Sequence, residues 1–278
     1  MSDVIDQSGD LSVPIWCAVN AIRLAEGAEP LPQSSDVAEE VPVAFRYNGF
    51  AHAVMMATPD HLTDFVAGFS LTEGIIAELS TIEAIRVGKS ADGMTVDVTL
   101  DALGFHRYLA ERRVRQSRGN TSCGLCGVED LKDLRSAPIR VAAGAPVTVL
   151  QAQIASDALR LLQPLSRRTR GAHASAWVGS DGAIRAVRED VGRHNALDKL
   201  IGAGLRGAFS RDDGFCLITS RCSFEMAQKA IAAGYSTLVS VSAPTALAIR
   251  TAAAAGLTLL SMDRSGGQYL YASPNGVA

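Results

Sequence analysis

The sequence predicts an α/β protein with an α+β N-terminal part and a C-terminal mixed sheet that carries helices on both faces. Two observations support this fold class. Residues 41–100 hold two hairpin-turn dipeptides, Asn48-Gly49 and Asp92-Gly93, separated by a helical pattern. Beyond residue 150, short apolar runs alternate with helical patterns that end at glycines, as in a sheet with crossover helices.

Four regions follow from this pattern. Residues 1–35 have weak periodicity and several turn formers, so we expect a loosely ordered extension. Residues 36–115 are expected to form a small α+β domain, and residues 146–278 a second domain. Residues 116–145 contain two cysteines, several glycines and no sustained period, which is typical of a connector.

In the N-terminal domain the pattern predicts two hairpins and one helix. Residues 41–47 and 51–57 are expected to be strands on either side of Asn48-Gly49, and residues 84–100 to form a hairpin around Asp92-Gly93. Thr58-Pro59 has the features of an N-cap and first helical residue, which predicts a helix to about Glu73. The apolar face of this helix would comprise Leu62, Phe65, Val66 and Phe69.

In the C-terminal domain a helix over residues 150–162 precedes a hairpin with strands at 174–178 and 183–187. A helix over 193–205 follows. From residue 215 onward the sequence pattern predicts the order β-α-β-α-β. The strands are expected at 215–220, 237–242 and 257–262, and the two helices are expected to end at Gly234 and Gly256. These three strands would be parallel.

Composition and charge exclude several functional classes. The 278 residues are 47% hydrophobic and 20% charged, as in ordinary globular proteins. With 26 Lys and Arg against 29 Asp and Glu, the net charge of -3 gives no global attraction to nucleic acid or to a membrane surface. Apolar runs stay well short of the roughly 18 residues of a membrane span, and the N-terminus is acidic. We therefore expect a cytoplasmic protein with no nucleic-acid or membrane partner.

The close cysteine pair Cys123-Gly-Leu-Cys126 is the main candidate for chemistry. Positive charge beside a C-x-x-C motif lowers the thiol pKa, and four arginines lie at positions 112–118. The pair could be a sulfur-carrying thiolate, a thioredoxin-type redox pair or half of a structural zinc site. Zinc would need two more ligands, but no second C-x-x-C and no H-x-x-x-H occurs. A redox pair would favour a strand-to-helix junction, so we rank sulfur carriage first and predict no metal site.

The densest polar cluster is residues 189–199, EDVGRHNALDK. Helical spacing places His194 and Asp198 on one face, and Asn195 and Lys199 on the next. One interpretation is a capped helix with a solvated face. The other is an anion site at the helix N-terminus, for which Arg193, His194 and Asn195 are the candidates.

The parallel strands predict where a ligand would bind, because ligands of open α/β sheets lie outside the carboxyl ends of the strands. Three loops follow these ends: residues 219–221, 240–245 and 262–267. The last is Gly-rich and suits backbone contact with a phosphate or guanine group. The candidate cofactor-binding residues in these loops are Ser220, Arg221, Met262, Asp263, Arg264, Ser265, Gly266 and Gly267. Cys216 and Cys222 are interpreted as packing residues.

Six segments together resemble one family, the formate dehydrogenase accessory sulfurtransferases (FdhD). They are NGF (48–50), GFSLTEGII (68–76), SCGLCG (122–127), EDVGRHNALDKLIG (189–202), TSRCSFEMAQKA (219–230) and SAPTALA (242–248). The segment at 189–202 is the most specific. The resemblance implies a homodimer and a C-terminal domain of cytidine-deaminase-like fold.

The resemblance also implies a function. A cysteine of the C-x-x-C loop accepts sulfur as a persulfide from a cysteine desulfurase. The sulfur passes to the bound acceptor, Mo-bis(molybdopterin guanine dinucleotide), which formate dehydrogenase needs. Carried over by motif, Cys123 is the persulfide residue, Cys126 its partner and residues 262–267 the cofactor-binding loop.

Two alternatives stay open. One is a non-catalytic chaperone that binds the cofactor and formate dehydrogenase. The other is a zinc-dependent deaminase-like enzyme, which would need H-x-E and P-C-x-x-C motifs, whereas here Asn195 and Ala196 follow His194.

Overall fold

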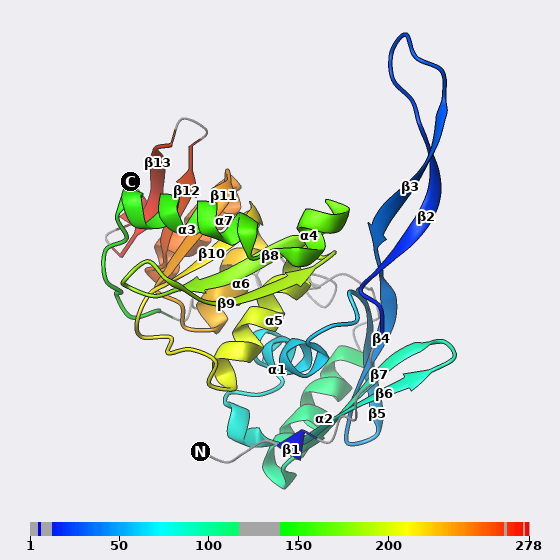
Figure 1. Cartoon of the computed structure of the whole chain (residues 1–278). Coiled ribbons are helices and arrows are strands. Elements are labelled where there is room, and N and C mark those ends of the chain that lie inside the picture. The colour runs from blue at the N-terminus through cyan, green and yellow to red at the C-terminus, as the bar shows by residue number, and fades with distance from the viewer. Residues whose placement is uncertain (1–4, 7–12, 117–139, 264–265, 275, 278) are drawn as a thin grey trace.

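A computed structural model describes residues 5–6, 13–116, 140–263, 266–274 and 276–277. They form a five-stranded N-terminal sheet, a seven-stranded C-terminal sheet and a projecting two-stranded hairpin (Figure 1). The first strands are β1 (Ile5–Asp6), β2 (Trp16–Arg23), β3 (Leu31–Ala38), β4 (Val41–Tyr47), β5 (Phe50–Ala57), β6 (Ile82–Ser90) and β7 (Gly93–Leu100). The later strands are β8 (His173–Val178), β9 (Ile184–Asp190), β10 (Phe215–Arg221), β11 (Thr237–Ser242), β12 (Thr258–Met262), β13 (Gln268–Ser273) and β14 (Gly276–Val277). The helices are α1 (Leu62–Thr72), η1 (Leu79–Thr81), α2 (Ala102–Gln116), α3 (Val149–Leu161), α4 (Pro164–Thr169), α5 (Arg193–Leu205), α6 (Phe224–Ala232) and α7 (Ala246–Ala255).

The N-terminal sheet has the strand order β1-β6-β7-β4-β5. Its β4–β5 hairpin turns at Asn48 and Gly49, which have φ values of 47° and 85°. Two positive φ values are what a two-residue hairpin turn needs, so the predicted turn is confirmed. Alternate side chains of β4, Val43 and Phe45 among them, are buried under α1 in one hydrophobic core.

The start of α1 was predicted wrongly. The helix begins at Leu62, after a left-handed residue at His61, and not at Thr58-Pro59. The Thr58 backbone N–H donates to the carboxylate of Asp190, and its hydroxyl accepts from the backbone N–H of Val191. Thr58 is therefore held by residues more than 130 positions away, which local capping rules do not anticipate.

The C-terminal sheet is mixed, in the order β14-β13-β12-β11-β10-β8-β9. Strands β10, β11 and β12 are parallel, while β8 and β9 form an antiparallel hairpin. Cys216 and Ile218 face a core made with α5, α6 and α7, whereas Phe215 and Leu217 face α3. The expected mixed sheet with helices on both faces is confirmed; α2, α4 and the strands after β12 were not predicted.

Residues 16–38 differ from the expected loose extension, because β2 and β3 pair in register from Trp16 with Ala38 to Arg23 with Leu31. We call this hairpin the arm; it projects away from both sheets (Figure 1). Neither face of most of the arm is buried, so its sequence lacks the alternation that marks a half-buried strand. At its base the Arg168 guanidinium lies 3.2 Å from the centroid of the Trp16 ring and pairs with Asp36 at 2.8 Å.

No helix in the described part of the chain is both long and apolar enough to cross a membrane.

Candidate functional site

The carboxyl ends of the three parallel strands lie side by side at one edge of the C-terminal sheet. β10 ends at Arg221, β11 at Ser242 and β12 at Met262. The pairing of Ser240 with Ser261 keeps two of these ends in register. The three loops chosen from the sequence therefore meet at one place, which we call the strand-end edge.

A pocket of about 260 Å³ opens beside two of these strand ends. Its polar lining residues are Ser156, Arg160, Gln163, Ser166, His173 and Thr219. Ser156 and Gln163 are buried, so the pocket offers hydrogen-bonding groups away from bulk water. Such a lining, with one arginine, suits a polar ring that carries or adjoins a negative charge.

The electrostatics of this edge depend on Arg193, at the first position of α5. Burial lowers the pKa of His173, and the charge of Arg193 lowers it further. Burial and Arg193 also lower the pKa of His194, while Glu225, 3.5 Å away, acts in the opposite direction. Both imidazoles are therefore neutral at pH 7, and the positive charge here comes from arginine.

The β12–β13 turn contains Met262, Asp263, Gly266 and Gly267, while Arg264 and Ser265 lie outside the described residues. The Asp263 N–H donates to the Gly267 carbonyl at 2.8 Å, and the Gly266 N–H donates to the Asp263 carbonyl at 3.1 Å. Gly266 has a φ of 89°, a conformation that favours glycine. The turn is closed on itself, which leaves fewer backbone groups for a ligand than an open Gly-rich loop.

Two of the other candidate residues point into the protein. Asn195 is buried, and its Nδ2 donates to the Met56 carbonyl and to Asp190. Ser220 is buried, and its hydroxyl donates to the Arg221 carbonyl at 3.1 Å. Arg221 itself is exposed at the end of β10. Of these three, only Arg221 therefore presents its side chain freely to solvent.

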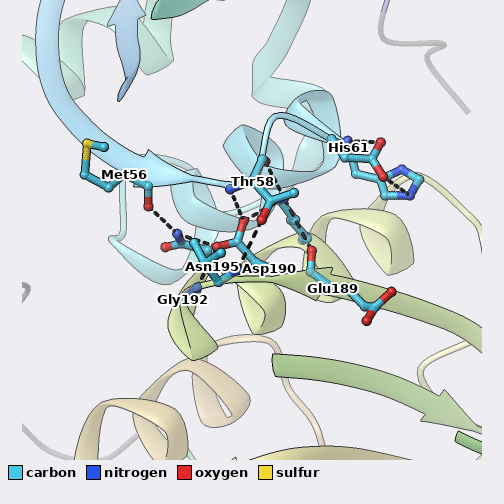
Figure 2. Close-up of polar contacts among 10 residues, drawn as sticks. Met56, Thr58, His61, Glu189, Asp190, Gly192 and Asn195 are labelled. Carbon is cyan, nitrogen blue, oxygen red and sulfur yellow. Dashed lines mark hydrogen bonds and ion pairs between the residues drawn. The ribbon is translucent and has the colours of Figure 1, made fainter. Parts of the chain in front are cut away.

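The residues around Asp190 form a polar cluster that joins the two sheets, and Figure 2 shows it at the end of β9. The Asp190 carboxylate accepts from the N–H groups of Thr58 and Gly192 and from Asn195. It also pairs at 2.7 Å with Lys199, which donates to the Thr58 carbonyl, and both charged side chains are fully buried. Neither interpretation of residues 189–199 made from the sequence, the capped helix or the anion site at Arg193, His194 and Asn195, anticipated this role between the sheets.

Two glycines let α1 and α5 approach at backbone distance. A Cβ on Gly68 would overlap the Asp198 carbonyl, and a Cβ on Gly202 would overlap the Asp64 carbonyl. These reciprocal contacts join the segments 68–76 and 189–202, the same segments that carried the family resemblance. We call this contact, together with the Asp190 cluster, the α1–α5 seam.

Charged groups line both sides of the seam. Arg188 and Arg206 pair with Asp64 at 2.7 and 2.9 Å. Lys229 of α6 pairs with Asp198 at 2.9 Å and with Glu73 at 3.5 Å. Burial alone would lower the pKa of Lys229, but these two carboxylates raise it.

The two cysteines assigned to catalysis, Cys123 and Cys126, lie outside the described residues. Cys216 and Cys222 are fully buried in the core, as predicted for packing residues. Burial raises the pKa of both thiols, that of Cys222 to about 12, so neither is a thiolate at neutral pH. Among the described residues, no group of His, Cys, Asp and Glu is arranged to hold a metal ion.

These features define a class: an α/β protein with a mixed sheet, a polar pocket at its parallel strand ends and a second sheet fixed to it by buried charges. The chain belongs to the FdhD/NarQ family, whose model matches residues 38–278. The family resemblance found in the sequence is thus confirmed.

The chain is similar to proteins called sulfur carrier protein FdhD. That of Cupriavidus necator is 44% identical over 269 residues, 96% of this chain and 92% of that one. That of Bordetella petrii is 45% identical over 243 residues, 87% of this chain and 86% of that one. The match to the Cupriavidus necator protein covers 96% of this chain, so it must include residues of the arm. The family model, in contrast, begins at residue 38, where the arm ends.

The fold resembles a crystal structure described as a formate dehydrogenase accessory protein from Desulfotalea psychrophila. The TM-score is 0.71 at 23% identity, over 95% of this chain and all of that one.

Proposed function

We propose that this protein carries sulfur as a persulfide on the Cys123/Cys126 pair and delivers it to a molybdenum cofactor held at the strand-end edge. The acceptor is the bis(molybdopterin guanine dinucleotide) form, and formate dehydrogenase is the enzyme served. The observation that carries the proposal is the membership of a family whose relatives are named sulfur carriers, combined with the state of the other cysteines.

The other cysteines are poor candidates for carriage. Cys216 and Cys222 are buried thiols with raised pKa values, and a neutral buried thiol neither attacks nor accepts sulfur. Cys17 lies on the arm, before the residues that the family model matches. Cys123 and Cys126 remain, and both lie within the matched residues.

Thiol–disulfide exchange explains why the proposed mechanism needs two cysteines. The Cys123 thiolate attacks the outer sulfur of a desulfurase persulfide, and the desulfurase thiolate leaves. The Cys126 thiolate then attacks the inner sulfur of the Cys123 persulfide, which forms a Cys123–Cys126 disulfide and releases the outer sulfur as sulfide. Two thiols are oxidised while the sulfane sulfur is reduced by two electrons, so the pair supplies the electrons for the release.

The strand-end edge supports binding of the guanine tails. The pocket beside Thr219 and Val241 has buried hydrogen-bonding groups, and Arg160 and Arg193 supply positive charge for phosphate groups. Arg264 and Arg221 belong to the loops at the same strand ends. The assignment of residues 262–267 as the main cofactor loop belongs to this proposal.

The sulfur step is tested by incubation with a cysteine desulfurase and cysteine, followed by intact mass spectrometry. Wild type should gain the mass of one sulfur atom, Cys123→Ala should gain none, and the control Cys17→Ala should behave as wild type. No adduct on wild type would leave only the non-catalytic chaperone. Stoichiometric zinc held through Cys123 would instead favour the deaminase-like alternative.

The division of labour between the cysteines has its own test. Cys126→Ala should accept sulfur as wild type does but activate formate dehydrogenase poorly, because it cannot form the disulfide that releases sulfide. Equal activation by Cys126→Ala and wild type would remove Cys126 from the mechanism.

The nucleotide site is tested by calorimetry with GDP. Arg160→Ala and Arg264→Ala should each weaken binding by up to about tenfold, the loss expected for one charge-assisted contact. Arg185→Ala is the control, because Arg185 pairs with Asp181 at the opposite edge of the sheet. Unchanged affinity in both variants would place the site elsewhere.

The proposed partners are a cysteine desulfurase, formate dehydrogenase and a second copy of the chain. The first two are tested by pull-down with purified proteins, in which the desulfurase should be retained by wild type.

A further inference from the structure

Helix α3 carries a second apolar face that points away from the protein. Its inner face, with Ala155 and Leu159, is buried against the C-terminal sheet (Figure 1). Leu150, Ile154 and Leu161 are 68, 53 and 69% exposed, and a rotation of about 100° per residue places all three on the opposite side of the helix. We call these three residues the outer stripe. A helix that is apolar on both sides is normally covered on both, so the outer stripe is typical of a binding surface.

Positive charge is concentrated at one end of the outer stripe. Arg167 of α4 lies at the C-terminal end of α3, where its Nη1 donates to the Leu161 carbonyl at 3.2 Å. The side chain of Arg160 at the same end is 72% exposed and pairs loosely with Asp157, at 3.8 Å. Residues 141–159, in contrast, contain no Lys or Arg. The surface is therefore apolar along its length and basic at its C-terminal end.

We propose that the outer stripe binds an amphipathic helix of a partner protein whose first turns are acidic. The partner helix lies antiparallel to α3, so that its N-terminus meets Arg160 and Arg167. Apolar side chains at helical spacing fill the stripe, and carboxylates pair with the two arginines. Acidic residues in the first turns also stabilise the partner helix itself, because a helix N-terminus carries partial positive charge. This inference concerns an interaction surface and stands independently of sulfur transfer.

The distribution of charge favours such a partner over a second copy of the chain. A two-fold contact through the outer stripe would lay α3 antiparallel on α3 of the other copy. The arginines of each copy would then face residues 146–150 of the other, PVTVL, which contain no carboxylate. A partner helix with acidic first turns supplies both the apolar groups and the opposite charge.

The same distribution disfavours a membrane surface. Helices that lie on membranes carry Lys and Arg along their polar face, beside the apolar one. Over residues 149–159 of α3 there is no basic residue, and Asp157 borders the outer stripe. The basic end alone suits a partner with a localised negative charge.

The size and the position of the outer stripe suit a transient partner. Thirteen residues give α3 a length of about 20 Å and a width of about 10 Å, so one face offers roughly 200 Å². A stable interface buries about 800 Å² on each partner, so the expected Kd is micromolar or weaker. Leu159 and Arg160 of α3 also line the pocket at the strand-end edge. A partner on the outer stripe is therefore held beside that pocket.

The first test uses two fluorescein-labelled, Ala-based peptide helices with leucines at the spacing of the outer stripe. One peptide has glutamates in its first two turns, and the other has lysines there. In fluorescence anisotropy the full chain should bind the glutamate peptide more tightly, and Ile154→Asp should weaken this binding by about tenfold or more. Leu247→Asp is the matched control, since Leu247 is 43% exposed and belongs to α7 on the other face of the sheet. Circular dichroism should show the same fold for both variants.

The second test reverses the charge at the end of the stripe. Arg167→Glu should weaken binding of the glutamate peptide by about two- to fivefold and tighten binding of the lysine peptide by a similar factor, because an exposed attraction becomes a repulsion and the reverse. Arg250→Glu is the control, because Arg250 is exposed on α7. It should leave both affinities unchanged.

Four results would overturn the proposal. Equal affinity of wild type for the two peptides would remove the acidic partner, and equal binding by Ile154→Asp and Leu247→Asp would place the peptide elsewhere. A change of oligomeric state caused by Ile154→Asp in sedimentation velocity would assign the stripe to a second copy. Cosedimentation of wild type with phosphatidylserine vesicles that Ile154→Asp abolishes would assign it to a membrane.

Discussion

The α1–α5 seam and the strand-end edge use polar residues in opposite ways. At the seam, Asp190, Lys199 and Asn195 are buried and satisfy one another across the two sheets. At the strand-end edge, Arg160 and Arg221 project from the surface beside a pocket. The specific sequence signature therefore marks the contact that holds the two sheets together, whereas the less distinctive loops form the surface to which the proposed function assigns the ligand.

The largest expected effect comes from breaking the buried pair of the seam. Lys199→Met should lower the free energy of unfolding by about 3–5 kcal/mol, because Asp190 is left charged and buried without its partner. Chemical denaturation measures the loss. Arg185→Met, which removes an exposed pair with Asp181, should leave the midpoint almost unchanged. Similar midpoints for the two variants would mean that the seam tolerates an unpaired charge.

A substitution that pushes α1 and α5 apart should lower the free energy of unfolding by a smaller amount. Gly202→Ala should lower the free energy of unfolding by about 1–3 kcal/mol, because its methyl group overlaps the Asp64 carbonyl and α1 must shift. Gly171→Ala is the matched control, since the nearest atoms to its added Cβ lie at 3.7 Å. Thermal unfolding of both variants checks the difference, and equal melting temperatures would contradict the close contact.

A substitution at the strand-end edge should affect ligand binding rather than the stability of the fold. Arg160→Ala should change the free energy of unfolding by less than about 0.5 kcal/mol, because the side chain is exposed. Arg160→Ala should nevertheless weaken GDP binding by up to about tenfold. A variant that unfolds easily and binds normally would reverse the roles assigned to the two regions.

The smallest effect is a dependence on pH at the start of α5. The pKa of His194 is lowered in the folded protein by burial and by Arg193, with Lys229 acting in the same direction and Glu225 against it. The unfolded chain therefore binds a proton more readily, and stability is lost as pH falls below the ordinary value of 6.5. His194→Gln should flatten the slope of unfolding free energy between pH 5 and 7. The pKa of His173 is lowered as well, so part of the pH dependence of stability should persist in this variant. A slope equal to that of wild type would show that His194 does not cause the dependence.

Local sequence predicted the elements whose ends are fixed by local chemistry. The predicted bounds of α5 coincide with the observed Arg193–Leu205, and both Asn48-Gly49 and Asp92-Gly93 mark hairpins. The strand-end loops were located because parallel strands end at one edge whatever their side chains are.

The remaining features depend on contacts that local sequence does not contain. Thr58 was predicted to be a helix cap because the sequence around it does not reveal its hydrogen bonds to residues 190 and 191. The role of Asn195 was assigned from its place near a helix start, whereas its acceptors include Met56 on the other sheet. The arm was missed because its small polar residues, such as Ser34 and Ser35, give no buried face to recognise.

The backbone contact between Gly68 and Gly202 also limits how this protein can move. A rotation of one sheet against the other would drive carbonyl groups of α1 and α5 into the opposing helix, and it would expose the Asp190–Lys199 pair. This contact therefore opposes a hinge motion between the two sheets. Under the proposed function, the sulfur donor and its acceptor would then have to meet without a hinge between the two sheets.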